Sequence, residues 1–135
     1  MSGPIKQILL VEDDQFLSSL LKKRLESEGL GVTLANDGQS ALAALEVSMP
    51  DLLLLDIILP GISGFEVLEK LRGDEKTKTL PVIIISNLGQ AEDRAKGKQF
   101  GVVDYFVKAR MPLEELVKIV KTYIQNPTAY ISSTV

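Results

Sequence analysis

The sequence predicts an α/β protein in which helices cover both faces of a parallel β-sheet. Three short segments are nearly continuous apolar runs, written I-L-L-V, L-L-L-L and V-I-I-I. Such runs are typical of strands that are buried on both faces of a sheet. Segments with helical spacing of apolar residues lie between them, so strands and helices alternate along the chain.

Five segments of strand length are expected to form the sheet, and they lie at residues 5–11, 31–35, 51–56, 81–86 and 102–107. Parallel strands joined by helices require right-handed crossovers, which place helices on both faces. Asp14 and either Asn36 or Asp37 favour the starts of the first two helices, and Gly29 suits the end of the first. Segment 90–100 has few large apolar side chains, so we expect it to be the least firmly docked helix.

Length and composition favour a single globular domain. The 135 residues are 45% hydrophobic and 24% charged. We place the domain at residues 1–127 and expect a flexible tail at 128–135, where Asn126-Pro127 can end the last helix. No apolar run is long enough to cross a bilayer, and the net charge of −3 gives no reason to expect nucleic-acid binding. A cytoplasmic location is therefore the default expectation.

Polar residues follow four of the predicted strands and form a candidate site. They are Glu12 and Asp13 after the first strand, Asp56 at the end of the third, Ser86 at the end of the fourth and Lys108 after the fifth. In open parallel sheets the functional crevice lies beyond the carboxyl ends of the strands. Taken one by one, such residues are more often helix caps or solvated loop residues. Their joint occurrence at four strand ends favours a shared site.

The chemistry of that set indicates phosphoryl transfer. Carboxylates this close to one another cannot all stay ionised without a nearby positive charge. The chain has neither Cys nor His, which excludes disulfides and thiolate or imidazole metal ligands, so a hard cation such as Mg²⁺ is the natural choice. A metal, the Lys108 ammonium and the Ser86 hydroxyl would surround a phosphoryl group, with Asp56 as the nucleophile.

Residues 6–125 resemble the response-regulator receiver family of two-component signalling. The resemblance is carried by I-L-L-V-E-D-D, L-L-L-L-D-I-I-L-P-G-I-S-G, I-I-I-S and G-V-V-D-Y-F-V-K, in this order and spacing. It implies a flavodoxin-like, doubly wound (βα)5 three-layer sandwich with strand order 2-1-3-4-5.

By this resemblance, Asp56 is the phospho-acceptor, and Glu12, Asp13, Asp56 and the main-chain carbonyl of Ile58 hold Mg²⁺. Lys108 is the lysine that contacts the phosphoryl group.

The resemblance also implies a switch. Ser86 moves toward the phosphoryl group, and Tyr105 then turns inward from a more exposed rotamer. The face formed by the fourth helix, the last strand and the last helix would change as a result.

The expected function is that of a regulator rather than an enzyme, with at most self-phosphorylation and self-dephosphorylation. A sensor histidine kinase or a phosphotransfer protein would donate the phosphoryl group from its phosphohistidine. No direct nucleic-acid or membrane contact is expected, and a phosphorylation-dependent dimer is a further expectation. The downstream partner is not readable from the sequence.

The sequence departs from the family pattern after Lys108 and at the pair of residues that follow Asp56 and Ser86 by two positions. Proline commonly follows the lysine in this family, through a cis bond, whereas Ala109 follows Lys108 here; we expect a trans bond. The residues two positions after Asp56 and Ser86 are Ile58 and Leu88. We expect this apolar pair to disfavour a hydrolytic water and to slow decay of the phosphorylated form.

Three rival interpretations remain at this stage. An aspartyl phosphohydrolase would usually carry a second carboxylate two residues after the nucleophile, where this chain has Ile58. A flavin or nucleotide carrier would need a phosphate cradle after the first strand, but the sequence there is E-D-D-Q. A receiver-like scaffold that is never phosphorylated would not need the acidic residues, the hydroxyl and the lysine.

Overall fold

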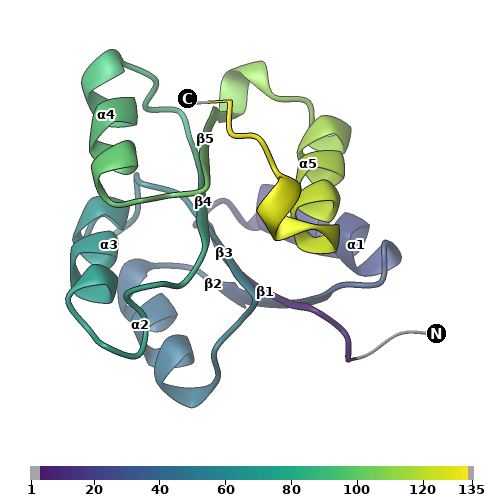
Figure 1. The fold of residues 1–135 in the computed structure, drawn as a ribbon, viewed down its shortest axis with the longest axis horizontal. Coiled ribbons are helices and arrows are strands. Elements are labelled where there is room, and N and C mark those ends of the chain that lie inside the picture. Colours follow the sequence, from purple (N-terminus) through teal and green to yellow (C-terminus); the bar gives the residue numbers. More distant parts are fainter. Residues whose placement is uncertain (1–3, 134–135) are drawn as a thin grey trace.

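The chain folds around one five-stranded parallel sheet with the strand order β2-β1-β3-β4-β5, seen in a computed structural model that describes residues 4–133 (Figure 1). The strands are β1 (Gln7–Val11), β2 (Gly31–Ala35), β3 (Leu52–Leu55), β4 (Val82–Ser86) and β5 (Asp104–Val107). The helices are α1 (Gln15–Ser27), α2 (Gly38–Val47), α3 (Gly64–Arg72), α4 (Ala91–Gln99) and α5 (Leu113–Gln125). The predicted fold class and strand order are confirmed.

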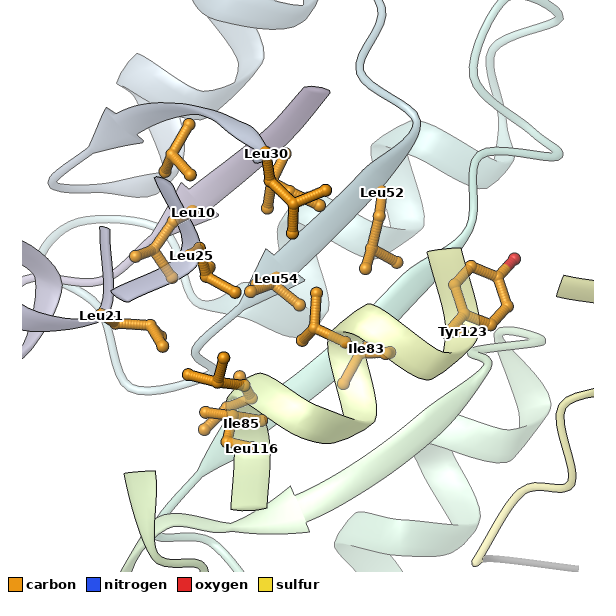
Figure 2. Packing of buried hydrophobic residues seen from close by; sticks show 14 of the residues in the cluster. Leu10, Leu21, Leu25, Leu30, Leu52, Leu54, Ile83, Ile85, Leu116 and Tyr123 are labelled. Carbon is orange, nitrogen blue, oxygen red and sulfur yellow. The ribbon is translucent and has the colours of Figure 1, made fainter. Parts of the chain in front are cut away.

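Helices α1 and α5 cover one face of the sheet, and α2, α3 and α4 cover the other (Figure 1). Successive side chains of a strand point to opposite faces, so Leu54 belongs to the first core and Leu55 to the second. Figure 2 shows the first core, in which the strand residues lie with Leu25 of α1 and Leu116 of α5. Burial on both faces explains the continuous apolar runs.

The predicted helix boundaries follow from capping side chains. The carboxylate of Asp14 accepts a hydrogen bond from the backbone N–H of Leu17 at 3.1 Å and begins α1. Asp37 rather than Asn36 caps α2. Gly29 follows α1 with a φ of 89°, a conformation that glycine adopts without strain.

Helix α4 carries little apolar anchoring, as the sequence indicates. Its one buried residue is Gly97. Phe100, directly after the helix, stacks on Phe65 of α3 with ring centroids 6.4 Å apart.

The segment after α5 turns once through a 3₁₀ helix, η2 (Pro127–Ala129), and its residues up to Ser133 lie against the domain. Whether residues 128–135 are flexible stays a prediction, and 134–135 lie outside the described residues. Among residues 4–133, no helix is long and apolar enough to span a membrane.

We predict that Gly64→Ala destabilises the fold where α3 meets the end of β3. A Cβ at Gly64 would collide with the carbonyl oxygen of Asp56 and lie 2.7 Å from the Cα of Ile57, so the backbone must shift. The expected loss in the free energy of unfolding is about 1–3 kcal/mol, measured by urea denaturation.

Gly73→Ala is the matched control, since the closest atom to its Cβ would be 3.4 Å away. This variant should change stability by less than about 0.5 kcal/mol. Equal effects of the two substitutions would contradict the steric argument.

Candidate functional site

The predicted site residues lie at the carboxyl ends of four neighbouring strands. Glu12 follows β1, Asp56 follows β3, Ser86 ends β4 and Lys108 follows β5. The order β1-β3-β4-β5 brings these four ends side by side. Residues far apart in the sequence therefore share one edge of the sheet, as the strand-end argument predicts.

The backbone fixes the two buried acids in place. The N–H of Asp56 donates to the carbonyl of Val11 at 3.1 Å, and the N–H of Glu12 donates to the carbonyl of Ala35 at 3.0 Å. The parallel ladder thus continues one residue beyond each strand. Both side chains are almost fully buried, with exposed fractions of 4% for Glu12 and 3% for Asp56.

Lys108 neutralises these acids. Its Nζ lies 2.7 Å from Oε1 of Glu12 and 2.7 Å from Oδ2 of Asp56. Burial acts to lower the pKa of Lys108, but hydrogen bonds to Asp56 and Glu12 outweigh it and raise that pKa above its usual value. The ammonium therefore stays charged. Burial also raises the pKa of Glu12, an effect that the Lys108 hydrogen bond opposes.

Three carboxylates form a group that could hold a metal ion. Glu12, Asp13 and Asp56 each offer one oxygen, and these oxygens all lie within 4.8 Å of one another. Asp13 is exposed, so the group is open on one side. The main chain of Ile58 lies beside it, since its N–H donates to Oδ1 of Asp56 at 3.2 Å. All the side-chain donors are oxygens, which suits a hard divalent cation.

The predicted switch residues meet at one peptide. Ser86 is fully buried, and its hydroxyl accepts a hydrogen bond from the N–H of Leu88 at 3.3 Å. The hydroxyl of Tyr105 donates to the carbonyl of Leu88 at 2.6 Å. A shift of the Leu88 peptide would therefore be felt by both side chains.

Tyr105 already points inward in this structure, with 1% of its surface exposed. The more exposed resting rotamer expected from the resemblance is not the one observed. Gly97 of α4 makes room for the ring, because a Cβ there would lie 3.0 Å from Cδ2 of Tyr105. Burial raises the pKa of Tyr105 to about 12, so its hydroxyl remains a proton donor.

The loop after β5 is tied to the loop after β4. The peptide bond between Lys108 and Ala109 is trans, as expected for a residue other than proline. Lys108 begins a short 3₁₀ helix, η1 (Lys108–Arg110), and the N–H of Ala109 donates to Oδ1 of Asn87 at 3.2 Å. The sequence reasoning missed Asn87; its position directly after Ser86 was the available signal.

We predict that Lys108→Met destabilises the protein, because it leaves two buried carboxylates without their cation. The expected loss in the free energy of unfolding is about 3 kcal/mol, measured by urea denaturation without divalent metal.

Lys78→Met is the control, since Lys78 pairs with Glu75 on the surface and both side chains are at least half exposed. Its effect should stay below about 1 kcal/mol. A similar loss in the free energy of unfolding in both variants would contradict the argument from the burial of Lys108.

Comparison with known proteins shows to which family the domain is similar. Residues 8–121 match the response regulator receiver domain. The phosphate regulon transcriptional regulatory protein PhoB of Rhizobium meliloti is 37% identical over 130 residues, which cover 96% of this chain and 57% of the relative. The transcriptional regulatory protein CpxR of Klebsiella pneumoniae is 44% identical over 104 residues, covering 77% of this chain and 43% of the relative. The chain thus spans about half the length of these curated relatives.

Solved structures show the same architecture. A CheY-like response regulator receiver domain protein from Methanospirillum hungatei superposes with a TM-score of 0.83 at 27% identity, covering 93% of this chain and 98% of that one. The Mn²⁺-bound form of response regulator Rcp1 gives a TM-score of 0.77 at 28% identity, covering 93% of this chain and 96% of that one. With its strand order and its acidic pocket, this chain belongs to the response regulator receiver domain family.

Proposed function

We propose that Asp56 accepts a phosphoryl group from the phosphohistidine of a sensor histidine kinase or a phosphotransfer protein. The observation that carries this proposal is the grouping of three carboxylates within 4.8 Å, with the Lys108 ammonium 2.7 Å from Asp56. Family membership supports a phosphoryl-accepting signalling role, and the pocket supports these residues as its site.

In the transfer step, a carboxylate oxygen of Asp56 attacks the phosphorus atom and forms an acyl phosphate. The bond between phosphorus and the imidazole nitrogen breaks, and its electron pair returns to the imidazole of the donor. The Lys108 ammonium would stabilise the charge on the phosphoryl oxygens, and the Ser86 hydroxyl would donate a hydrogen bond to one of them. No general base is needed for this step, because a carboxylate attacks through an oxygen lone pair and transfers no proton.

Mg²⁺ belongs to this proposal. Glu12, Asp13, Asp56 and the main-chain carbonyl of Ile58 would hold the ion, and the all-oxygen donor set supports this choice. The ion would supply positive charge to the oxygens of the incoming phosphoryl group. Response regulator Rcp1 has been solved in a Mn²⁺-bound form, which supports a divalent metal as a ligand here.

Other parts of the proposal concern the role of the whole protein. Catalysis would be limited to self-phosphorylation by small acyl phosphates and to self-dephosphorylation. The described residues would contact no nucleic acid and no membrane, and the location would be cytoplasmic. Phosphorylation would change the α4–β5–α5 face and would support a dimer or the binding of an output protein.

The rival functions are less well supported. Ile58 occupies the position where an aspartyl phosphohydrolase would place its second carboxylate, and 54% of its surface is exposed. A nucleotide or flavin phosphate would meet Glu12 and Asp13 rather than a cradle of N–H groups. The scaffold that is never phosphorylated would share this geometry, so an experiment must separate it from the proposal.

We predict that incubation with Mg²⁺ and acetyl phosphate adds the mass of one phosphoryl group to the wild-type chain. Asp56→Asn should show no gain, because an amide is not a nucleophile of comparable strength. Intact-mass spectrometry measures both.

Asp37→Asn serves as the matched control, since Asp37 only caps α2, and it should gain mass like the wild type. Omission of Mg²⁺ should abolish the gain. An unmodified wild type would support the scaffold, whereas multiple-turnover hydrolysis of small phosphate esters would support the hydrolase.

We also predict that Ile58→Asn shortens the lifetime of the phosphorylated chain at least severalfold. A polar side chain at this exposed position could hold a water near the acyl phosphate, which an isoleucine cannot do. The mass-loss rate after removal of acetyl phosphate measures the lifetime. Val47→Asn, which alters a residue that is 87% exposed on α2, should leave the rate unchanged. An unchanged or slower decay of Ile58→Asn would refute the explanation.

A further inference from the structure

The segment after α5 does not leave the domain but returns toward β5 (Figure 1). After η2, Tyr130 and Ser133 reach Asp104, the first residue of β5. The ring of Tyr130 also packs edge-on against Tyr123 of α5, with centroids 5.5 Å apart and an interplanar angle of 81°. We call residues 127–133 the latch.

The anchor of the latch is a completely buried acid. Asp104 has no exposed surface, and its carboxylate accepts four hydrogen bonds from the described residues 4–133. One comes from the N–H of Tyr105 at 2.9 Å. The other three come from the latch: the Tyr130 hydroxyl at 2.7 Å, the Ser133 N–H at 2.9 Å and the Ser133 hydroxyl.

The dependence between acid and latch is mutual. A buried carboxylate is strongly destabilising unless hydrogen-bond donors satisfy its oxygens. Here the latch supplies three of the four described donors, so its binding offsets the cost of burying Asp104. Burial, together with the hydrogen bond and the charge of Asp104, raises the pKa of Tyr130, which keeps its hydroxyl protonated.

The latch lies beside β5, an edge strand to which another chain could bind. β5 is the last strand of the sheet, so one of its sides has no partner strand. Unpaired edges attract further strands or chains unless something covers them. Tyr130 and Ser133 line a groove beside β5 together with Arg94, Arg110 and Ile119, and the groove joins α4, β5 and α5.

We propose that residues 127–133 are an intramolecular latch that occupies the α4–β5–α5 face and is held there by Asp104. Release of Tyr130 and Ser133, which form one wall of the groove, uncovers the β5 side of this face, so a strand of another protein can pair with β5 only in the open form. Through Tyr130 and Ser133 the latch contacts Asp104 and Tyr123, which are not among the three carboxylate residues of the proposed phosphorylation site, so the inference does not rest on the proposed role of Asp56.

The chain has no cysteine, which permits a direct test with a single added thiol. Ile119→Cys places this thiol in the groove beside Tyr130 in the full chain. We expect a bulky maleimide to label it slowly. The further changes Tyr130→Phe and Ser133→Ala should speed labelling at least about tenfold, because each removes one hydrogen bond to a charged acceptor and the loss of one such bond already corresponds to about that ratio.

Two controls separate release from general loosening. Ile131→Ala alters a latch residue that is 85% exposed, so it should leave the labelling rate unchanged. A thiol at the exposed position of Val47→Cys should react equally fast with and without the latch substitutions. Asp56→Asn should not affect labelling, so failure of phosphorylation and failure of the latch can be told apart.

Amide hydrogen exchange provides a second measurement on the unlabelled chain. The N–H of Ser133 should exchange slowly in the wild type and faster in Tyr130→Phe or Asp104→Asn. A fast wild-type Ser133 amide, or labelling of Ile119→Cys that ignores the latch substitutions, would overturn the proposal.

Discussion

The contact of Lys108 with Glu12 and Asp56 is the interaction on which the site depends. The carboxylates of Glu12 and Asp56, with exposed fractions of 4% and 3%, would repel each other without a cation between them. Each partner comes from a different strand end, so the contact exists only when β1, β3 and β5 lie in the observed order. The chemistry proposed for Asp56 therefore depends on the order of the strands in the sheet.

The same arrangement links the surroundings of Asp56 to helix α4. Ser86 and Tyr105 both bind the peptide of Leu88, one through its N–H and the other through its carbonyl. This peptide offers a short physical route by which a change near Asp56 could reach α4. The loose anchoring of α4, with Gly97 as its one buried residue, is consistent with a helix that can adjust.

Neighbouring residues of β5 contact different parts of the protein, because successive side chains of a strand point to opposite faces of the sheet. Tyr105 belongs to the core under α2, α3 and α4, whereas Asp104 holds the segment that returns from α5. The N–H of Tyr105 donates to the Asp104 carboxylate. The inward aromatic and the latch thus lie one residue apart at the edge of the sheet.

Local patterns in the sequence determined the elements, and the tertiary structure decided the long-range contacts. Apolar runs predicted the buried strands, and Asp14 and Gly29 marked the ends of α1, because these preferences act within a few residues. Strand-end logic also gathered Glu12, Asp56 and Lys108 correctly. The binding of Tyr130 to Asp104, 26 residues away, left no local signal. The inward position of Tyr105 likewise depended on space beside another helix, which only packing creates.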